Sequence, residues 1–326
     1  MRIVILCIVL TVAAYGSGWT LWGDLPADLR PTGLQSNCSG QYIVEFQESI
    51  NDSIVYKELV INTDGNMEHR EAEIDLSGSQ EGEDLFIPFP YPDDYENWDT
   101  SAGVTRLSVS GDTLWSVRLD SLQNRVEVYQ PVLPCKEGGI FTVFGPDNGD
   151  FVWKAYRLSE SGEVLMSSEF QMRGGPVIVL SDLMETVDSG FVICGTTDDL
   201  GMSLFMYVIG IDSDGRQIFE VKEDFRFHAA SSITTPCHSG NIYIAGYTGN
   251  ERPDGWFMPP YDSDVFLMKL DPSGNELWRT VYDCPGENRA SAMHVDEDGS
   301  IALVIQSFSY ESSDQLRKYS LLFYQQ

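Results

Sequence analysis

The chain has 326 residues, of which 42 % are hydrophobic, so it is long enough to bury an ordinary core. Its 50 acidic and 20 basic residues give a formal net charge of −30, which argues against a protein that binds nucleic acid or anionic membranes. We interpret this charge as a solvated acidic surface suited to an extracellular or salty medium. Attraction of cations or of a basic partner is the alternative interpretation.

The first 18 residues differ from the rest of the chain. Met1 and Arg2 are followed by a 12-residue run at 3–14 that is apolar except for Thr11, and then by Tyr15 and the small residues up to Gly18. A basic start, a short apolar run and small residues are typical of a secretory signal peptide, and the run is shorter than the roughly 20 residues of a membrane span. We therefore expect residues 1–18 to be a signal peptide cleaved near Gly16 or Gly18, with no membrane span after it. The mature protein is expected to be secreted, whether extracellular, at the cell surface or periplasmic.

From Gly18 onward, one sequence pattern recurs six times. It consists of an apolar strand, a short Asp/Ser/Gly turn and a second strand that opens on a bulky residue, as in VFLMKLDPSGNELW at 265–278. A glycine stands four residues before each bulky residue, and the bulky residues follow one another at intervals of 46 to 59 residues: Trp22, His69, Trp115, Met166, Phe219 and Trp278. A regular interval of this size indicates a repeat architecture.

The predicted strands alternate with glycine-containing turns along the chain. Those before the turns are expected at 55–62, 104–109, 153–158, 206–211, 265–270 and 318–324. Earlier hairpin strands are expected near 42–45, 140–143, 191–195, 242–246 and 301–304. They are rich in β-branched and aromatic residues, and no segment after residue 20 keeps a helical period. Four strands in each of six units predict an all-β fold, a six-bladed β-propeller of four-stranded blades that forms a single domain over 19–326.

The two ends of the chain complement each other. The N-terminus has a second strand, Gly18–Trp22, without a first, and the C-terminus has a first strand, 318–324, without a second. Pairing them completes the last blade and leaves no open sheet edge. Blade two is short, because 16 residues separate His69 from Leu85 where other units have 20 to 25. We expect a truncated innermost strand there, with the acidic residues 75–84 as a loop.

Catalytic and metal-binding motifs are absent from the sequence. It contains no G-x-S-x-G, H-E-x-x-H, P-loop or C-x-x-C pattern, and none of its four histidines stands in a catalytic pattern. The Asp-rich turns, such as Asp212–Gly215, are too short for a calcium loop and have the residues that a tight hairpin needs. We predict no catalytic residues, no metal and no cofactor.

Five cysteines follow the predicted signal peptide, an odd number. Cys38, Cys135 and Cys237 occupy the same place in alternate repeats, just before a turn glycine. A three-cysteine metal site is one interpretation. We favour small, half-buried residues too far apart to pair with each other, because a disulfide needs Cα atoms within about 7 Å. At least one free thiol is therefore expected.

Two long connections carry exposed aromatic and acidic residues together. In a four-stranded meander, the link between the second and third strands emerges opposite the hairpin turns. This link is long at 90–99 in blade two and at 247–262 in blade five. Aromatic faces beside carboxylates suit a sugar or a cationic ligand, and loops often carry binding residues. The candidate ligand-binding residues are Tyr91, Tyr95, Trp98, Trp256, Phe257 and Tyr261. The alternative is that Trp98, Trp256 and Tyr261 fold back over their blades.

Residues 231–283 resemble a known family. The stretches SGNIYIAGYTGN and YDSDVFLMKLDPSGNELWRTVYD are similar to bacterial β-propeller repeats of secreted and cell-surface proteins, the SBBP type. Residues 182–224 resemble them more weakly. The resemblance implies export and a propeller fold, without a shared catalytic set. The phrase DPSGNELW also resembles quinoprotein propeller repeats, but no cofactor-binding set accompanies it.

These features predict a secreted, non-enzymatic propeller that binds a glycan, a peptide or a surface partner through its loops. An extracellular glycan or protein is the expected partner. The alternative is a carbohydrate-active hydrolase or lyase on the same scaffold. Its carboxylate pair would be drawn from four acidic residues of the long loops, Asp93, Asp94, Asp254 and Asp262.

Overall fold

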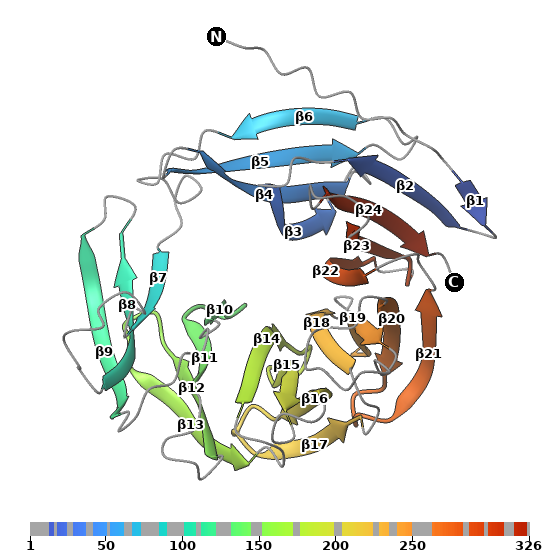
Figure 1. Ribbon diagram of the computed structural model, residues 1–326. Helices are drawn as coiled ribbons and strands as arrows, with labels where there is room; N and C mark the ends of the chain where they lie inside the picture. The colour runs from blue at the N-terminus through green and yellow to red at the C-terminus, as the bar shows by residue number, and fades with distance from the viewer. Residues whose placement is uncertain are drawn as a thin grey trace. The chain divides into compact units, whose positions relative to one another are not determined.

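A computed structural model gives the fold. It describes residues 13–15, 18–24, 29–36, 42–50, 53–61, 67–72, 85–89, 101–108, 112–121, 132–144, 152–171, 177–198, 204–223, 228–234, 240–249, 263–282, 287–296, 299–309 and 316–324. Before residue 103 and after residue 307, only the backbone is described. These residues form 24 β-strands and, within the described ranges, no helix (Figure 1), so the predicted all-β class is confirmed. Accordingly, no described helix is long and apolar enough to cross a membrane.

The chain divides into two compact units, which we describe separately. The first contains residues 1–73, 231–271 and 276–326, and the second contains 74–230 and 272–275. All neighbouring strands within the sheets are antiparallel except for one pair in the first unit.

The second unit contains three sheets. The first has β7 (Leu85–Phe89), β8 (Ser101–Leu107) and β9 (Thr113–Ser121). The next has β10 (Val132–Pro134), β11 (Ile140–Phe144), β12 (Val152–Leu158) and β13 (Val164–Gln171). The third has β14 (Val177–Glu185), β15 (Phe191–Asp198), β16 (Leu204–Ile211) and β17 (Gln217–Lys222). The sheet expected to have a truncated innermost strand has three strands, and the predicted loop at 75–84 lies outside the described residues.

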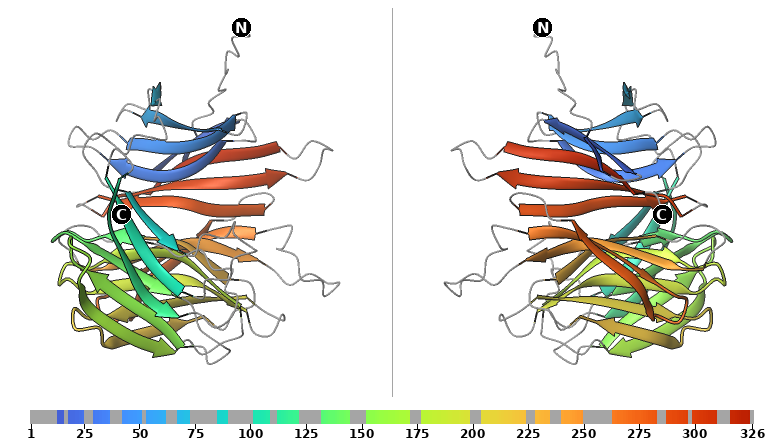
Figure 2. Two further views of the ribbon diagram at one scale, coloured as in Figure 1. Left: turned by 90° about the vertical axis from the view of Figure 1, so that its left-hand side faces the viewer. Right: turned by 90° about the vertical axis from the view of Figure 1, so that its right-hand side faces the viewer.

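The first unit contains two sheets. One has β3 (Leu29–Ser36), β4 (Tyr42–Ile50), β5 (Ser53–Ile61) and β6 (Met67–Ala72). The other has nine strands: β1 (Ala13–Tyr15), β2 (Gly18–Asp24), β18 (His228–Thr234), β19 (Ile242–Gly249), β20 (Ser263–Leu270), β21 (Glu276–Tyr282), β22 (Glu287–Val295), β23 (Ile301–Ser309) and β24 (Leu316–Tyr324). Figure 2 shows β22–β24, in red, next to the blue strands β3–β5 of the same unit.

The sequence predicts two separate blades for the strands of this nine-stranded sheet, whereas in the structure they form one sheet. The difference depends on a single parallel pair, Ser263 with Glu287, which joins the starts of β20 and β22. The expected pairing of the chain ends is confirmed in the same sheet. β2 lies antiparallel to β24, with Leu21 opposite Leu321 and Trp22 opposite Ser320.

The apolar side chains of the strands are buried in clusters. In the second unit, Phe141 of β11 stacks on Phe191 of β15, with ring centroids 3.8 Å apart, and the fully buried Trp153 joins the same cluster. In the first unit, Val265 and Leu303 belong to a second cluster formed by strands β19, β20, β22 and β23. Burial of these side chains is the dominant favourable contribution to folding.

The recurring turns share one backbone conformation. Gly162, Gly215 and Gly274 have φ between 81° and 85°, a region that favours glycine. In the turn at 212–216, the Asp212 carboxylate accepts hydrogen bonds from the backbone N–H groups of Asp214 and Arg216, at 3.0 and 2.7 Å. Aspartate at this position therefore stabilises the turn, as the sequence analysis favoured over calcium binding.

After each of these turns, the second strand contains an irregularity at the same place. The strand register shifts by one residue, which leaves a single aliphatic residue unpaired in each outer strand: Leu114, Leu165, Ile218 and Leu277. A bulge of this kind redirects the side chains beside it. In each case the next residue is the bulky residue of the repeat.

The bulky residue packs against the turn glycine of the following sheet. A Cβ atom on Gly162 would lie 2.9 Å from the Trp115 ring, and one on Gly274 would lie 2.5 Å from Phe219 Cγ. At Gly215, the same atom would approach Met166 Cγ at 3.1 Å. The glycine and the bulky residue therefore recur together because each glycine accommodates the bulky residue of the preceding repeat.

This contact predicts that Gly274→Ala will destabilise the fold more than Gly138→Ala. Both glycines have positive φ, at 81° and 85°, so each substitution carries a backbone cost of about 1–2 kcal/mol. At Gly274 the new methyl group also meets the Phe219 ring, whereas at Gly138 it meets the flexible Glu160 side chain. Overpacking should add about 1–3 kcal/mol at Gly274 alone. Urea unfolding followed by tryptophan fluorescence measures the difference, and equal losses would contradict the contact.

Candidate functional site

The sheet edges can be assigned from the strand register. In the sheet β14–β17, Phe191 pairs with Ile211 beside the hairpin turns, and Asp198 pairs with Leu204 at the opposite edge. In every sheet, we call the end at which the hairpin turns lie the turn edge. We call the opposite end, at which the second strand ends and the third begins, the loop edge. In the sheet β14–β17, the link between the second and third strands therefore lies opposite the hairpin turns, as predicted.

All six predicted ligand-binding residues lie outside the described residues. Tyr91, Tyr95 and Trp98 fall within 90–100, between β7 and β8, and Trp256, Phe257 and Tyr261 fall within 250–262, between β19 and β20. The structure does describe the strand ends on both sides of these segments. Gly249, the last residue of β19, pairs with Ser263, the first residue of β20.

A buried polar network holds the strand end that follows 250–262. Asn288 of β22 is fully buried, and its backbone N–H donates to Ser263 Oγ at 2.9 Å, while Ser263 Oγ donates to the Asn288 carbonyl at the same distance. The Asn288 amide nitrogen donates to the Ser263 carbonyl at 3.1 Å, and Ser307 Oγ donates to Asn288 Oδ1 at 2.5 Å. These bonds join β20, β22 and β23 at the loop edge. They supply the partners that the buried polar groups of Ser263, Asn288 and Ser307 require.

An aromatic–cation pair lies beside this network. The Arg289 guanidinium stands over the ring of Tyr247, with its carbon 5.2 Å from the ring centroid. Tyr247 was placed at the start of the long connection by the sequence analysis, and in the structure β19 continues through it to Gly249. Both side chains are half-buried. Together they present a planar hydrogen-bond donor and an aromatic face at the loop edge, two groups that suit sugars, carboxylates and peptides.

Nothing in the sequence pattern singles out Ser263, Asn288, Ser307 or Arg289. Ser263 and Asn288 are 25 residues apart and belong to repeat units that were predicted to form separate blades. The parallel pair between Ser263 and Glu287 and the hydrogen bonds of Asn288 show their proximity in the structure. No local motif in the sequence carries this information.

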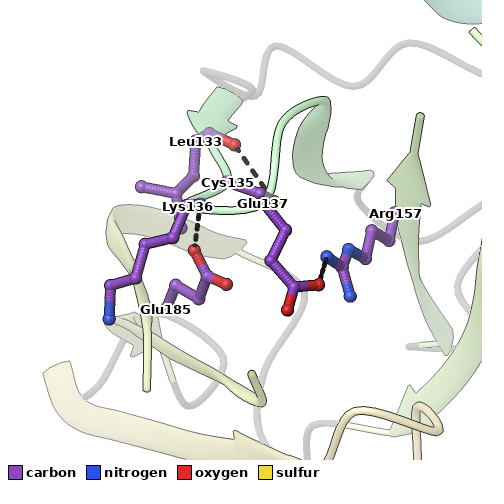
Figure 3. Close-up of polar contacts among 6 residues, drawn as sticks. All are labelled: Leu133, Cys135, Lys136, Glu137, Arg157 and Glu185. Carbon is purple, nitrogen blue, oxygen red and sulfur yellow. Dashed lines mark hydrogen bonds and ion pairs between the residues drawn. The ribbon is translucent and has the colours of Figure 1, made fainter. Parts of the chain in front are cut away.

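A second polar cluster lies at the turn edge of the second unit (Figure 3). The Glu185 carboxylate of β14 accepts a hydrogen bond from the Lys136 backbone N–H at 2.6 Å, and Arg157 pairs with Glu137 at 3.1 Å. Glu185 is buried, so it connects the first turn of its own sheet to that of the neighbouring sheet. We assign this cluster a structural role.

Cys135 is part of this cluster and is unreactive by its environment. Burial, with a further contribution from the Glu185 charge, raises the pKa of the Cys135 thiol to about 11. Burial raises the pKa of the Cys194 thiol as well. Both thiols are free, so the prediction of at least one free thiol is confirmed. A protonated thiol is neither a nucleophile nor a metal ligand.

The proposed three-cysteine arrangement is only partly visible. Cys38 and Cys237, which share the repeat position of Cys135, lie outside the described residues. Over the ranges that the structure describes, no group of three His, Cys, Asp or Glu side chains could hold a metal ion. His294 pairs with Asp296 at 3.3 Å, next to the turn between β22 and β23.

Several solved protein structures are similar to this chain in fold, at low sequence identity. No family model matches the chain, and no curated protein matches it significantly. A protein of unknown function from Dyadobacter fermentans is 10 % identical with a TM-score of 0.52, covering 94 % of this chain and 98 % of its own. A DUF4221 family member from Bacteroides vulgatus is 12 % identical, with a TM-score of 0.45 and coverages of 97 % and 98 %.

An exo-β-1,3-galactanase from Phanerochaete chrysosporium is 8 % identical, with a TM-score of 0.41 and coverages of 89 % and 91 %. At such identities a likeness concerns the fold alone. Of these three, the Dyadobacter structure has the similarity needed to support an argument, and it supports a shared all-β fold over nearly the whole chain.

We predict that Asn288→Ala will destabilise the first unit by about 2–3 kcal/mol, because it leaves the Ser263 carbonyl and the Ser307 hydroxyl without the Asn288 side-chain amide. Ser167→Ala, at an exposed position of β13, is the control and should change the free energy of unfolding by less than about 0.5 kcal/mol. Chemical unfolding measures the free energy of unfolding of both variants. A loss at Asn288→Ala no larger than that of the control would contradict the role of the network.

The raised pKa of Cys135 predicts a loss of stability in alkaline solution. The unfolded thiol loses its proton above its ordinary pKa of 9.0, whereas the folded thiol keeps it until about 11. Ionisation therefore favours the unfolded chain as the pH rises from about 9 to about 11, by about 2 kcal/mol. Cys135→Ala should flatten the curve of unfolding free energy against pH over this window. An unchanged slope in the variant would contradict the prediction.

Proposed function

We propose that this chain is a secreted binding protein with a six-bladed propeller fold, which recognises an extracellular glycan, peptide or surface partner at its loop edge. Division of the nine-stranded sheet at its single parallel pair gives β18–β21 as one blade and β22–β24 with β2 as another. Together with the other four sheets, this makes six blades. The pairing of β2 with β24 supports the closure of the last blade by the two chain ends.

The observation that carries the binding proposal is the buried network of Ser263, Asn288 and Ser307. It fixes one end of a 13-residue connection, 250–262, that contains Trp256, Phe257 and Tyr261. A binding loop is most effective when a rigid scaffold fixes its ends, because less conformational entropy is lost when the ligand binds. The fully satisfied network provides such a scaffold.

The chemistry next to this network favours a polar, partly flat ligand. Tyr247 and Arg289 add an aromatic face and a guanidinium group to the aromatic residues of 250–262. Sugars stack on aromatic rings, and guanidinium groups bind carboxylates and hydroxyls. The net charge of −30 makes nucleic acid an unsuitable partner. A glycan or an extracellular protein is the partner that these properties suit.

Export is part of the same proposal. Cleavage near Gly16 or Gly18 would remove β1 together with the signal segment. The pairing of β2 with β24 begins at Thr20, so it would survive this cleavage. Free Cys135 and Cys194 are compatible with an oxidising environment because both thiols are buried.

A glycan array followed by substitution of the aromatic loop residues tests the proposal. Trp98→Ala and Trp256→Ala should each weaken binding of a glycan identified on the array by about fivefold to thirtyfold, since stacking of one ring contributes about 1–2 kcal/mol. Leu277→Ala, an exposed residue at the turn edge, is the control and should bind normally.

Product analysis of the bound glycan separates binding from catalysis. Recovery of the intact glycan supports the binding protein, and shortened products support the carbohydrate-active enzyme instead. Unchanged affinity in both tryptophan variants would reject the loop edge as the binding surface.

A further inference from the structure

The turn edge of the second unit carries exposed aliphatic side chains that the proposed function does not use. Seven large hydrophobic residues are exposed among those whose side chains the structure describes. Five of them lie at this edge and are 49–57 % exposed: Leu114, Val164, Leu165, Val187 and Ile218. Exposed apolar residues that gather in one region often mark an interaction surface.

Their exposure follows from the backbone of the repeats. Leu114, Leu165 and Ile218 are the unpaired residues at the bulges of β9, β13 and β17. The following residue of each strand packs toward the next sheet, and the aliphatic residue remains at the surface. A polar side chain would satisfy this position equally well on physical grounds, so its aliphatic character in three successive sheets is not required by the bulge.

Contacts between the sheets place these positions on neighbouring sheets that touch at the turn edge. The Trp115 indole N–H donates to the Glu160 carbonyl at 2.7 Å, which places β9 against the turn at 159–163. Ser168 Oγ donates to the Gly215 carbonyl, which places β13 against the turn at 212–216. The aliphatic residues of β9, β13 and β17 therefore occupy neighbouring sheets that touch at this edge.

Carboxylates surround the aliphatic residues. The exposed acidic side chains of this edge are Asp112, Glu137, Glu160, Glu163, Asp188 and Asp214. Lys136 and Arg216 are the exposed basic residues within the same described turns, and Arg216 is 3.5 Å from Asp214. The surface thus combines apolar contacts with a negative potential.

We propose that this edge of the second unit binds a positively charged, amphipathic protein segment, with aliphatic side chains that contact Leu114, Leu165 and Ile218 and with lysine or arginine residues that meet the carboxylates. A second copy of the chain is a poor occupant, because it would bring two acidic surfaces together. Addition of a β-strand from the partner is also disfavoured, because the bulges interrupt the hydrogen-bonding edges of β9, β13 and β17. The partner is therefore held by its side chains.

The test uses the full-length protein and two synthetic peptides of equal charge. One is an amphipathic peptide of leucine and lysine, and the other has serine in place of every leucine. Fluorescence anisotropy at physiological salt should show at least tenfold tighter binding of the leucine–lysine peptide. Equal affinity for the two peptides would mean attraction by charge alone and would overturn the proposal.

Substitutions locate the surface. The double variant Leu165→Ser/Ile218→Ser should lose most of the preference for the leucine–lysine peptide, whereas Val281→Ser, an exposed residue of β21 in the first unit, should keep it. Leu114→Ser alone is a smaller change and should weaken binding of the leucine–lysine peptide by about threefold, with folding confirmed by circular dichroism.

A preference for the leucine–lysine peptide that persists in both the double variant and Leu114→Ser would overturn the assignment. Binding of glycans at the loop edge should be the same in all these variants, which separates this surface from the proposed function.

Discussion

The packing of a bulky side chain on the turn glycine of the next sheet is the constraint on which the repeated structure depends. Gly162, Gly215 and Gly274 each combine a positive φ with a close approach by a side chain of the preceding repeat. Any larger residue would have to overcome both the backbone strain and the clash. The bulge before the bulky residue completes this arrangement, because it redirects the side chain toward its glycine. One short sequence pattern therefore specifies the turn, the strand irregularity and the contact between sheets.

The two edges of the sheets differ in how they are stabilised. At the turn edge, backbone turns, carboxylate–amide bonds such as Glu185 with Lys136, and glycine contacts fix the structure. At the loop edge of the nine-stranded sheet, a fully satisfied network around Asn288 does so. Both edges are therefore held together by hydrogen bonds or close contacts where they are described. Groups that a fixed scaffold presents lose less entropy on binding.

The sequence predicts those features of the fold that follow from the repeat and from the strands left over at its two ends. The local pattern and the count of strands at each end are sufficient to predict the all-β class, the strands and the pairing of the two end strands, but not the register of that pairing. The pairing of Ser263 with Glu287, which joins two expected blades, occurs once in the chain. The repeat period therefore does not predict it. The same holds for the cation–aromatic pair of Arg289 and Tyr247. The six aromatic residues predicted to bind a ligand lie outside the described residues, and their role remains a prediction.

The pairing of β2 with β24 has a consequence for the order in which the protein folds. Trp22 and Ser320 are neighbours in the sheet although nearly the whole chain separates them. Closing so long a segment carries a large entropic cost, and the contact cannot form before the ribosome has made the last strand. We therefore expect this pairing to be among the last contacts to form. Until then, β24 lacks its neighbour β2, so the newly made chain passes through a stage in which an open sheet edge is available to chaperones or to unwanted association.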